Sequence, residues 1–223
     1  MFVLGLTGSI AMGKSAAAET FRAFGVPVFD ADAAVHELLG PGGAAVRPVT
    51  AVFPACRAAD GGIDRRALGR AVFADRGALS RLEAIVHPLV QEMEHRFLAR
   101  CCADRRPVVV LDIPLLYETG GERLVDAVAV VSAPAFLQRL RVLRRGGMSP
   151  ERLAAIRARQ LADREKRGRA DFVIPTGGPR RQAVNAIGRI LHLVRHRRGR
   201  AWPHHWTRRA PARQRCDRTT SGS

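Results

Sequence analysis

The sequence predicts an α/β protein with a five-stranded parallel sheet that carries helices on both faces. Five short apolar and β-branched runs alternate with helical patterns, at 2–7, 26–30, 107–113, 126–132 and 171–175. Nearly continuous apolar strands separated by helices are typical of a parallel sheet that is covered on both sides. In such sheets ligands bind beyond the carboxyl ends of the strands, so the residues that follow each run are the first candidates for a site.

The first run leads into a glycine-rich segment with the spacing of a phosphate-binding loop, or P-loop. Residues 8–15 read G-S-I-A-M-G-K-S, and an alanine-rich helical segment follows directly. Glycines allow backbone N–H groups to surround phosphate oxygens, and the N-terminal end of the next helix attracts negative charge. Lys14 is expected to contact the β- and γ-phosphates, and the hydroxyl of Ser15 to bind Mg²⁺. The predicted cofactor-binding residues are Thr7, Gly8, Ser9, Ile10, Ala11, Met12, Gly13, Lys14, Ser15 and Ala16.

Length and composition indicate one principal domain. The chain has 223 residues, of which 47% are hydrophobic, and no apolar run approaches the roughly 18 residues of a membrane span. The N-terminal residues lack the basic segment of a secretory signal, so we expect neither a signal peptide nor a membrane anchor. The four cysteines show no metal-ligand spacing, which favours reduced thiols in the cytoplasm.

The pattern divides the chain into a core domain of residues 1–198 and a basic tail of residues 199–223. A helical insertion at about 33–104 is longer than a crossover between strands requires, and its clearest helix spans 78–101. Arginines and glycines at about 141–168 predict a helical lid over phosphates, although a solvated basic surface is the alternative. The tail is rich in Arg, Pro, His, Thr and Ser and is expected to lack a fold.

The formal net charge of +17 raises the possibility of nucleic-acid binding. Much of that charge lies after about residue 195, and a terminal basic run is usually solvated. We therefore do not expect nucleic acid as a partner, but an NTP-binding protein that acts on nucleic acid through its tail stays open as an alternative. The sequence carries no sign of the oligomeric state.

Acidic residues follow the second and third runs. Asp32 is the candidate carboxylate that orients an acceptor hydroxyl, while the alternative is that it caps the N-terminus of the helix at 33–39. The two roles are compatible. Asp112 ends a hydrophobic strand and suits contact with Mg²⁺, with a strand-end acid of no special role as the alternative.

Missing motifs narrow the class of P-loop protein. The guanine-reading Asn/Thr-Lys-x-Asp sequence of GTPases and the Ser-Gly-Gly signature of ABC-type ATPases are both absent from the sequence. A small kinase remains, because phosphoryl transfer needs little beyond positioning, charge neutralisation and one carboxylate. A kinase for another small molecule, such as a nucleoside monophosphate, is the alternative at this point.

The sequence resembles the dephospho-coenzyme A kinase family along nearly all of residues 1–196. The matching segments are Leu6-Thr7-Gly8-Ser9, Gly13-Lys14-Ser15, Val28-Phe29-Asp30-Ala31-Asp32, His87-Pro88, Asp112-Ile113-Pro114-Leu115-Leu116-Tyr117-Glu118, Arg141 with Arg145, Arg159-Gln160, Glu165-Lys166-Arg167 and Ala170-Asp171-Phe172-Val173-Ile174. The P-loop alone is generic, whereas the remaining set in this order is specific to the family.

The resemblance implies phosphorylation of the ribose 3′-hydroxyl of dephospho-CoA with ATP and Mg²⁺, the final step of coenzyme A synthesis. It implies that Asp32 is the general base and that Lys14, Arg141 and Arg145 act on the phosphates. The implied acceptor-binding residues are Asp32, His87, Pro114, Leu115, Leu116 and Glu118, and the implied metal ligands are Ser15 and Asp112.

Three positions depart from the family pattern, and one of them, Ala16 in place of a common threonine, is expected to have no effect because Ser15 carries the metal. Ala11 stands where glycine is usual, in a loop expected to need a positive φ, which costs an L-residue roughly 1–2 kcal/mol. We therefore expect weaker ATP binding than a glycine would give. Thr176 stands where many members have asparagine beside the adenine.

Overall fold

The five predicted runs form one parallel sheet, in the order β2-β3-β1-β4-β5. The computed structural model describes residues 1–73, 75–144 and 160–206. The strands are β1 Phe2–Thr7, β2 Val28–Asp30, β3 Val108–Asp112, β4 Ala127–Ser132 and β5 Phe172–Pro175. The helices are α1 Lys14–Ala23, α2 Ala31–Leu39, α3 Val46–Val52, η1 Pro54–Cys56, α4 Arg65–Phe73, α5 Arg76–Ala103, η2 Gly121–Leu124, α6 Ala135–Arg144, α8 Asp163–Arg169 and α9 Arg180–Val194. The predicted α/β architecture is confirmed.

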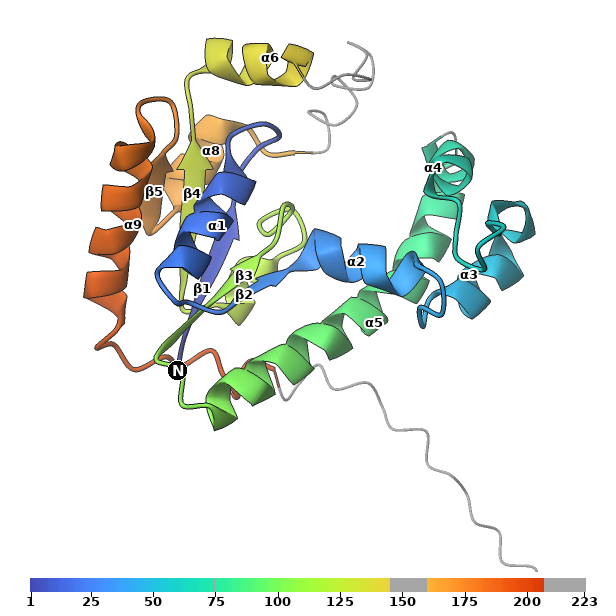
Figure 1. The fold of residues 1–223 in the computed structure, drawn as a ribbon, viewed down its shortest axis with the longest axis horizontal. Helices are drawn as coiled ribbons and strands as arrows, with labels where there is room; N and C mark the ends of the chain where they lie inside the picture. Colours follow the sequence, from blue (N-terminus) through green and yellow to red (C-terminus); the bar gives the residue numbers. More distant parts are fainter. Residues whose placement is uncertain (74, 145–159, 207–223) are drawn as a thin grey trace, which may run out of the picture.

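Helices cover both faces of the sheet, as the apolar strands predict (Figure 1). Alternate residues of β1 point to opposite faces. Leu4 belongs to the core beneath α1 and α9, where it joins Phe21 and Ile187. Val3 belongs to the core on the other face, which includes Leu98 of α5. Because both faces are covered, every residue of the central strands β1 and β3 is buried.

Helices α2 to α5 lie between β2 and β3 and have a core of their own. Figure 1 shows this helical insertion projecting away from the sheet, with α3 and α4 at its far end. The position of these helices agrees with the insertion predicted at about 33–104. Helix α2 starts directly at the end of β2. Its first turn therefore lies at the carboxyl edge of the sheet, where the P-loop also follows its strand.

The prediction of an unfolded tail from residue 199 is wrong for its first part, residues 199–206, which we call the C-terminal strap. Trp206 is 2% exposed and its Nε1 donates a hydrogen bond to the backbone oxygen of Leu124 at 3.0 Å. The backbone N–H groups of Arg200 and Ala201 donate to the carboxylate of Asp126. Two tryptophans in a basic segment supply the apolar surface that holds the strap on the sheet core. Residues 207–223 lie outside the described residues.

The predicted lid is described only in part. Helix α6 and helix α8 cover its two ends, while residues 145–159, including Arg145, lie outside the described residues. Within residues 1–73, 75–144 and 160–206, none of the helices has the length and apolar character needed to cross a membrane.

Candidate active site

The loop between β1 and α1 has the backbone conformation that its sequence predicts. Gly13, the N-cap of α1, has a φ of 88°. Ala11 has a φ of 59°, so the expected positive φ is confirmed for an L-residue. At Gly8 a Cβ atom would lie 2.2 Å from a side-chain carbon of Val131 in β4, so no larger residue fits there. Residues 8–13 therefore form a tightly packed turn at the carboxyl end of the sheet.

Side chains from α6 hold the loop from outside. Gln138 donates a hydrogen bond to the backbone oxygen of Ile10 at 2.9 Å, and Arg141 donates to the backbone oxygens of Ala11 and Thr176. The structure thus brings Arg141 to the P-loop. The role of Gln138 was missed, because a single glutamine on an amphipathic helix carries no signal in the sequence.

Thr176 also lies directly on the P-loop. Its hydroxyl donates to the backbone oxygens of Met12 and Ser132. A Cβ atom built at Gly13 would lie 3.2 Å from the Cβ of Thr176. A threonine at this position therefore packs against the end of the loop and helps to fix it.

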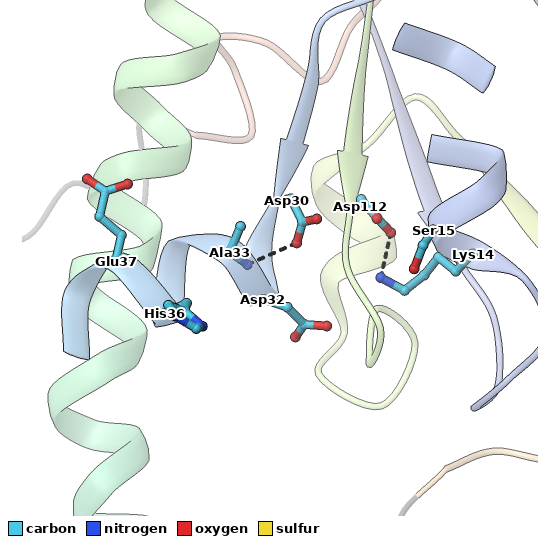
Figure 2. Close-up of a pocket in the computed structure, with 8 residues that line it drawn as sticks. All are labelled: Lys14, Ser15, Asp30, Asp32, Ala33, His36, Glu37 and Asp112. Atoms are coloured by element: carbon cyan, nitrogen blue, oxygen red, sulfur yellow. Dashed lines mark hydrogen bonds and ion pairs between the residues drawn. The ribbon is translucent and has the colours of Figure 1, made fainter. Parts of the chain in front are cut away.

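A pocket opens beside the P-loop, between α1 and α2 (Figure 2). It is lined by Lys14, Ser15, Asp30, Asp32, Ala33, His36, Glu37 and Asp112. Lys14 and Ser15 come from the start of α1, Asp112 from the end of β3, and the others from the end of β2 and from α2. The structure therefore gathers the predicted phosphate, metal and acceptor-side groups around one space.

Lys14 and Asp112 form a charged pair inside this pocket. The Lys14 Nζ lies 2.7 Å from the Asp112 Oδ1, and Asp112 is 1% exposed. Burial raises the pKa of Asp112 to about 6, even though the charge and hydrogen bond of Lys14 act in the opposite direction. Asp30 and Asp32 raise the pKa further through charge repulsion. The carboxyl group therefore changes its protonation state near pH 6 and is mainly ionised at pH 7.

Asp30, and not Asp32, caps the N-terminus of α2. The Asp30 Oδ1 accepts a hydrogen bond from the Ala33 N–H at 3.0 Å, and the helix begins at Ala31. The alternative in which Asp32 is the cap is therefore wrong. Asp32 is exposed to the pocket and makes no hydrogen bond or ion pair with any residue that the structure describes. Its carboxylate is free to meet a ligand.

The donor atoms in the pocket suit a hard divalent cation. Ser15 offers a hydroxyl, and Asp112 offers a carboxylate at the end of β3, in the same pocket. Oxygen donors of this kind are those that Mg²⁺ prefers. Among the described residues no group of three or more His, Cys, Asp or Glu side chains forms a metal site by itself. Mg²⁺ is usually held by one or two protein groups together with substrate phosphates.

The residues expected to contact the acceptor fall into different places. Leu116 is completely buried in the sheet core, so the expectation that its side chain meets a substrate is wrong. Leu115 is 37% exposed, and Pro114 presents its backbone oxygen to the hydroxyl of Thr7 at 3.0 Å. His87 is exposed on α5 and is not among the residues that line the pocket beside Lys14.

Glu118 also departs from its expected place. Its Oε1 accepts a hydrogen bond from the Leu161 N–H and lies 2.8 Å from the Lys166 Nζ. The carboxylate is therefore engaged by the chain near α8, and it is not part of the pocket lining beside Asp32.

Comparisons with known proteins agree with this geometry. The family model described as dephospho-CoA kinase matches residues 2–179. The dephospho-CoA kinase of Rhodospirillum rubrum is 55% identical over 193 residues, which cover 86% of this chain and 92% of that protein. The dephospho-CoA kinase of Paramagnetospirillum magneticum is 60% identical over 167 residues, or 75% of this chain and 78% of that protein.

Solved structures show the same fold. A crystal structure of a Thermus thermophilus protein has a TM-score of 0.73 and 35% identity, covering 86% of this chain and 97% of that one. The dephospho-CoA kinase of Campylobacter jejuni has a TM-score of 0.60 at 23% identity, with 86% and 96% covered, which supports the fold alone. With a family model that matches most of its length and relatives of this similarity, the chain belongs to the dephospho-CoA kinase family.

Proposed function

We propose that the chain transfers the γ-phosphoryl group of ATP to the ribose 3′-hydroxyl of dephospho-CoA and so forms coenzyme A. Its family makes the chain a phosphotransferase that uses a nucleoside triphosphate. The observation that carries the proposal is that the P-loop lysine and an unengaged carboxylate, Asp32, line one pocket. Such a pair is what phosphoryl transfer to a hydroxyl requires.

The nucleotide side of the reaction belongs to the P-loop and its surroundings. Backbone N–H groups of the loop and the start of α1 bind phosphate oxygens, and Lys14 neutralises charge on the β- and γ-phosphates. Arg141 donates a hydrogen bond to the backbone oxygen of Ala11, and this contact with the loop supports a role for it at the same phosphates. Mg²⁺ would be held by Ser15 and Asp112, and it supplies further neutralisation of the phosphate charge.

The acceptor side belongs to α2. The Asp32 carboxylate orients the 3′-hydroxyl and takes its proton as the oxygen forms a bond to the γ-phosphorus. The bond from that phosphorus to the β–γ bridging oxygen breaks, and ADP leaves with the electron pair. His36 lies one helical turn beyond Asp32 on the pocket wall, and its ring contacts the Arg65 guanidinium, which brings one cation close to this otherwise acidic wall. Pro114, Leu115 and His87 remain proposed acceptor contacts outside the pocket that Asp32 lines.

The test is release of ADP with and without dephospho-CoA, together with mass spectrometry of the product and a panel of other acceptors. We expect acceptor-dependent turnover and a product heavier by one phosphoryl group, and we expect nucleoside monophosphates to support much slower turnover. Faster turnover with a nucleoside monophosphate than with dephospho-CoA would overturn the proposed acceptor.

A further inference from the structure

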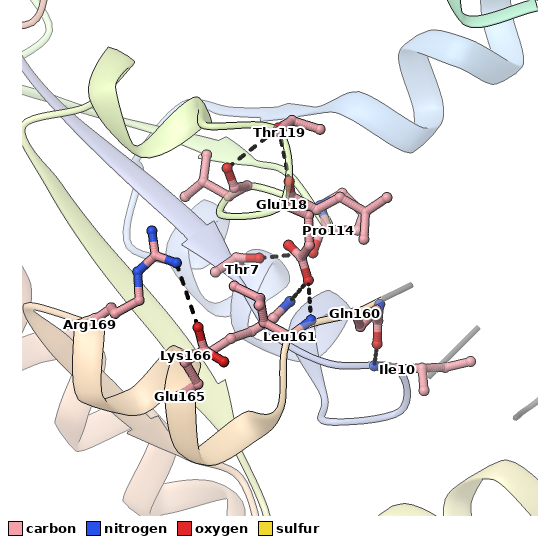
Figure 3. Close-up of polar contacts among 12 residues, drawn as sticks. Thr7, Ile10, Pro114, Glu118, Thr119, Gln160, Leu161, Glu165, Lys166 and Arg169 are labelled. Atoms are coloured by element: carbon pink, nitrogen blue, oxygen red, sulfur yellow. Dashed lines mark hydrogen bonds and ion pairs between the residues drawn. The ribbon is translucent and has the colours of Figure 1, made fainter. Parts of the chain in front are cut away.

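The second lysine of the chain, Lys166 on α8, is 0% exposed although it carries a charge. Its Nζ lies 2.8 Å from the Oε1 of Glu118 (Figure 3), whose other oxygen, Oε2, is buried with no hydrogen-bond partner among the described residues. A buried ion pair adds little to the net stability of a fold. Removal of one partner is strongly destabilising, because the remaining charge stays buried without compensation. The pair is therefore better explained by what it positions than by what it stabilises.

A short chain of contacts leads from this pair to the P-loop. The Glu118 Oε1 also accepts a hydrogen bond from the Leu161 N–H at 2.8 Å. The neighbouring residue, Gln160, accepts a hydrogen bond from the Ile10 N–H at 3.0 Å through its side-chain Oε1 (Figure 3). The side-chain oxygen of one glutamine thus holds a backbone amide in the middle of the phosphate-binding loop.

Both partners of the ion pair are themselves firmly placed. Glu118 belongs to the segment after β3, in which Leu116 is buried in the core and the backbone oxygen of Pro114 accepts the hydroxyl of Thr7 at the end of β1. Helix α8 is tied to the end of β4, because Ser132 donates a hydrogen bond to Asp163 at 2.8 Å. The ion pair therefore joins two fixed parts of the molecule and determines where residues 160 and 161 lie between them.

We propose that Glu118 and Lys166 are positioning residues for the P-loop, acting through Gln160 and its contact with the Ile10 amide. The inference rests on the proposed binding of ATP at residues 8–15. It moves Glu118 from the acceptor, where the resemblance puts it, to the nucleotide side. Loss of the pair displaces Gln160 and loosens the turn that leads to Gly13 and Lys14, whereas Asp32 and α2 are left in place.

A purely structural pair makes a different prediction. If the ion pair only stabilised the fold, its loss would lower the unfolding midpoint and would act independently of Gln160. A positioning pair changes the dissociation constant of ATP, leaves the KM for dephospho-CoA unchanged, and has little further effect once Gln160 can no longer hold the loop.

The experiment is a double-mutant cycle with Lys166→Met, Gln160→Met and the double variant, measured as the dissociation constant of ATP by calorimetry. We expect each single variant to weaken ATP binding about tenfold and the double variant to weaken it about tenfold as well, where independent effects would multiply to about a hundredfold. Arg169→Met is the matched control, because it removes an ion pair with Glu122 and a contact with the Tyr117 ring from the same helix, while the Glu118–Lys166 pair and the Gln160 hydrogen bond keep both of their partners. It should leave ATP binding within about twofold of the parent protein, since additive effects are the rule for separate sites.

The variant Glu118→Met/Lys166→Met covers the case in which Lys166→Met does not fold, because it removes both charges and fills the space with apolar side chains. We expect it to fold and to show the same loss of ATP affinity. ATP binding that is unchanged in this variant, or effects at positions 160 and 166 that simply multiply, would overturn the inference. Calorimetry with ATP alone does not involve the acceptor, so failure of the proposed reaction with dephospho-CoA would be seen separately.

Discussion

Asp30 and Asp32 lie two residues apart at the carboxyl end of β2, and the helix that follows is capped by Asp30 alone. The Asp30 Oδ1 accepts a hydrogen bond from the Ala33 N–H at 3.0 Å. Asp32 lies in the first turn of α2 and faces the pocket beside Lys14 (Figure 2). A carboxylate in the first turn of a helix is favoured by the helix dipole. The arrangement therefore leaves Asp32 available for chemistry without loss of the helix start.

Asp32→Asn should remove the chemical step while it leaves the fold and the nucleotide site intact. The amide cannot take a proton from the acceptor hydroxyl, so we expect acceptor-dependent ADP release to fall by about 10²- to 10⁴-fold. Asp30 still caps α2 in this variant, so the unfolding midpoint should stay close to that of the parent protein. Single-turnover ADP release and calorimetry with ATP measure the two effects.

Glu37→Gln is the matched control for this experiment. Glu37 lines the same pocket from the same helix, and Figure 2 shows its carboxylate directed away from Lys14. We expect its loss to change turnover by less than about threefold, which is the scale of a surface substitution. If Asp32→Asn were as active as Glu37→Gln, Asp32 would not be the base.

The strands and the P-loop could be predicted because their signals are local. A nearly continuous apolar run between two helical patterns identifies a strand of a parallel sheet, and the spacing of Gly8, Gly13 and Lys14 identifies the turn between strand and helix. The sequence could not decide whether Asp30 or Asp32 is the cap, because the answer changes when the start of the helix moves by one or two residues. Helix boundaries are uncertain from sequence at that scale.

The positions of Leu116 and Glu118 could not be predicted for a different reason. A motif gives residue types and their order, but it does not say which side chains of an irregular segment turn toward the core. The partner of Glu118 is Lys166, which lies far along the chain on α8. Only the packing of that helix against the end of the sheet brings the two charges together.

Activity should fall at acidic pH through Asp112. Its pKa in the folded protein is raised from 3.8 to about 6, chiefly by burial. At pH 7 the group is therefore mainly ionised and can bind Mg²⁺, whereas below about pH 6 it is mainly protonated. We expect kcat/KM for ATP to fall about tenfold for each pH unit below this pKa, since this constant reports groups of the free enzyme.

The pH profile of Asp112→Asn provides the comparison. ATP itself binds protons in the same range, so only the part of the profile that disappears in the variant belongs to the carboxyl group. We expect lower activity at pH 7 and a flatter acid limb. The sign for stability is also fixed: because the folded state raises this pKa, the group's contribution to the free energy of unfolding declines as pH rises from about 4 to about 6. If the acid limb were equally steep in the parent protein and in Asp112→Asn, the loss of activity at low pH would belong to another group.

Ala11→Gly should improve ATP binding. The φ of 59° at Ala11 costs an L-residue roughly 1–2 kcal/mol, which glycine does not incur. A loop that reaches its phosphate-binding shape without this cost should lower the KM for ATP by up to about tenfold, because 1.4 kcal/mol corresponds to a factor of ten. Steady-state kinetics at saturating dephospho-CoA measures the change.

Arg105→Gly separates this local effect from general relief of backbone strain. Arg105 is the other non-glycine residue with a positive φ among those the structure describes, at 53°, and it lies before β3 at the amino end of the sheet. Its replacement should leave the KM for ATP unchanged. Equal KM values in the parent protein and in Ala11→Gly would show that the methyl group of Ala11 does not hinder nucleotide binding.

The C-terminal strap should contribute measurably to stability. Trp206 is 2% exposed, lies against Trp202 with ring centroids 6.3 Å apart, and donates a hydrogen bond to Leu124. Trp206→Ala removes a buried aromatic side chain, so we expect a loss of about 3–5 kcal/mol in the free energy of unfolding. A chain that ends at Arg198 lacks the whole strap, so it should lose at least as much stability as Trp206→Ala. Urea unfolding followed by far-ultraviolet circular dichroism compares these chains, and a chain ending at Arg198 with full stability would contradict the packing of residues 199–206 on the core.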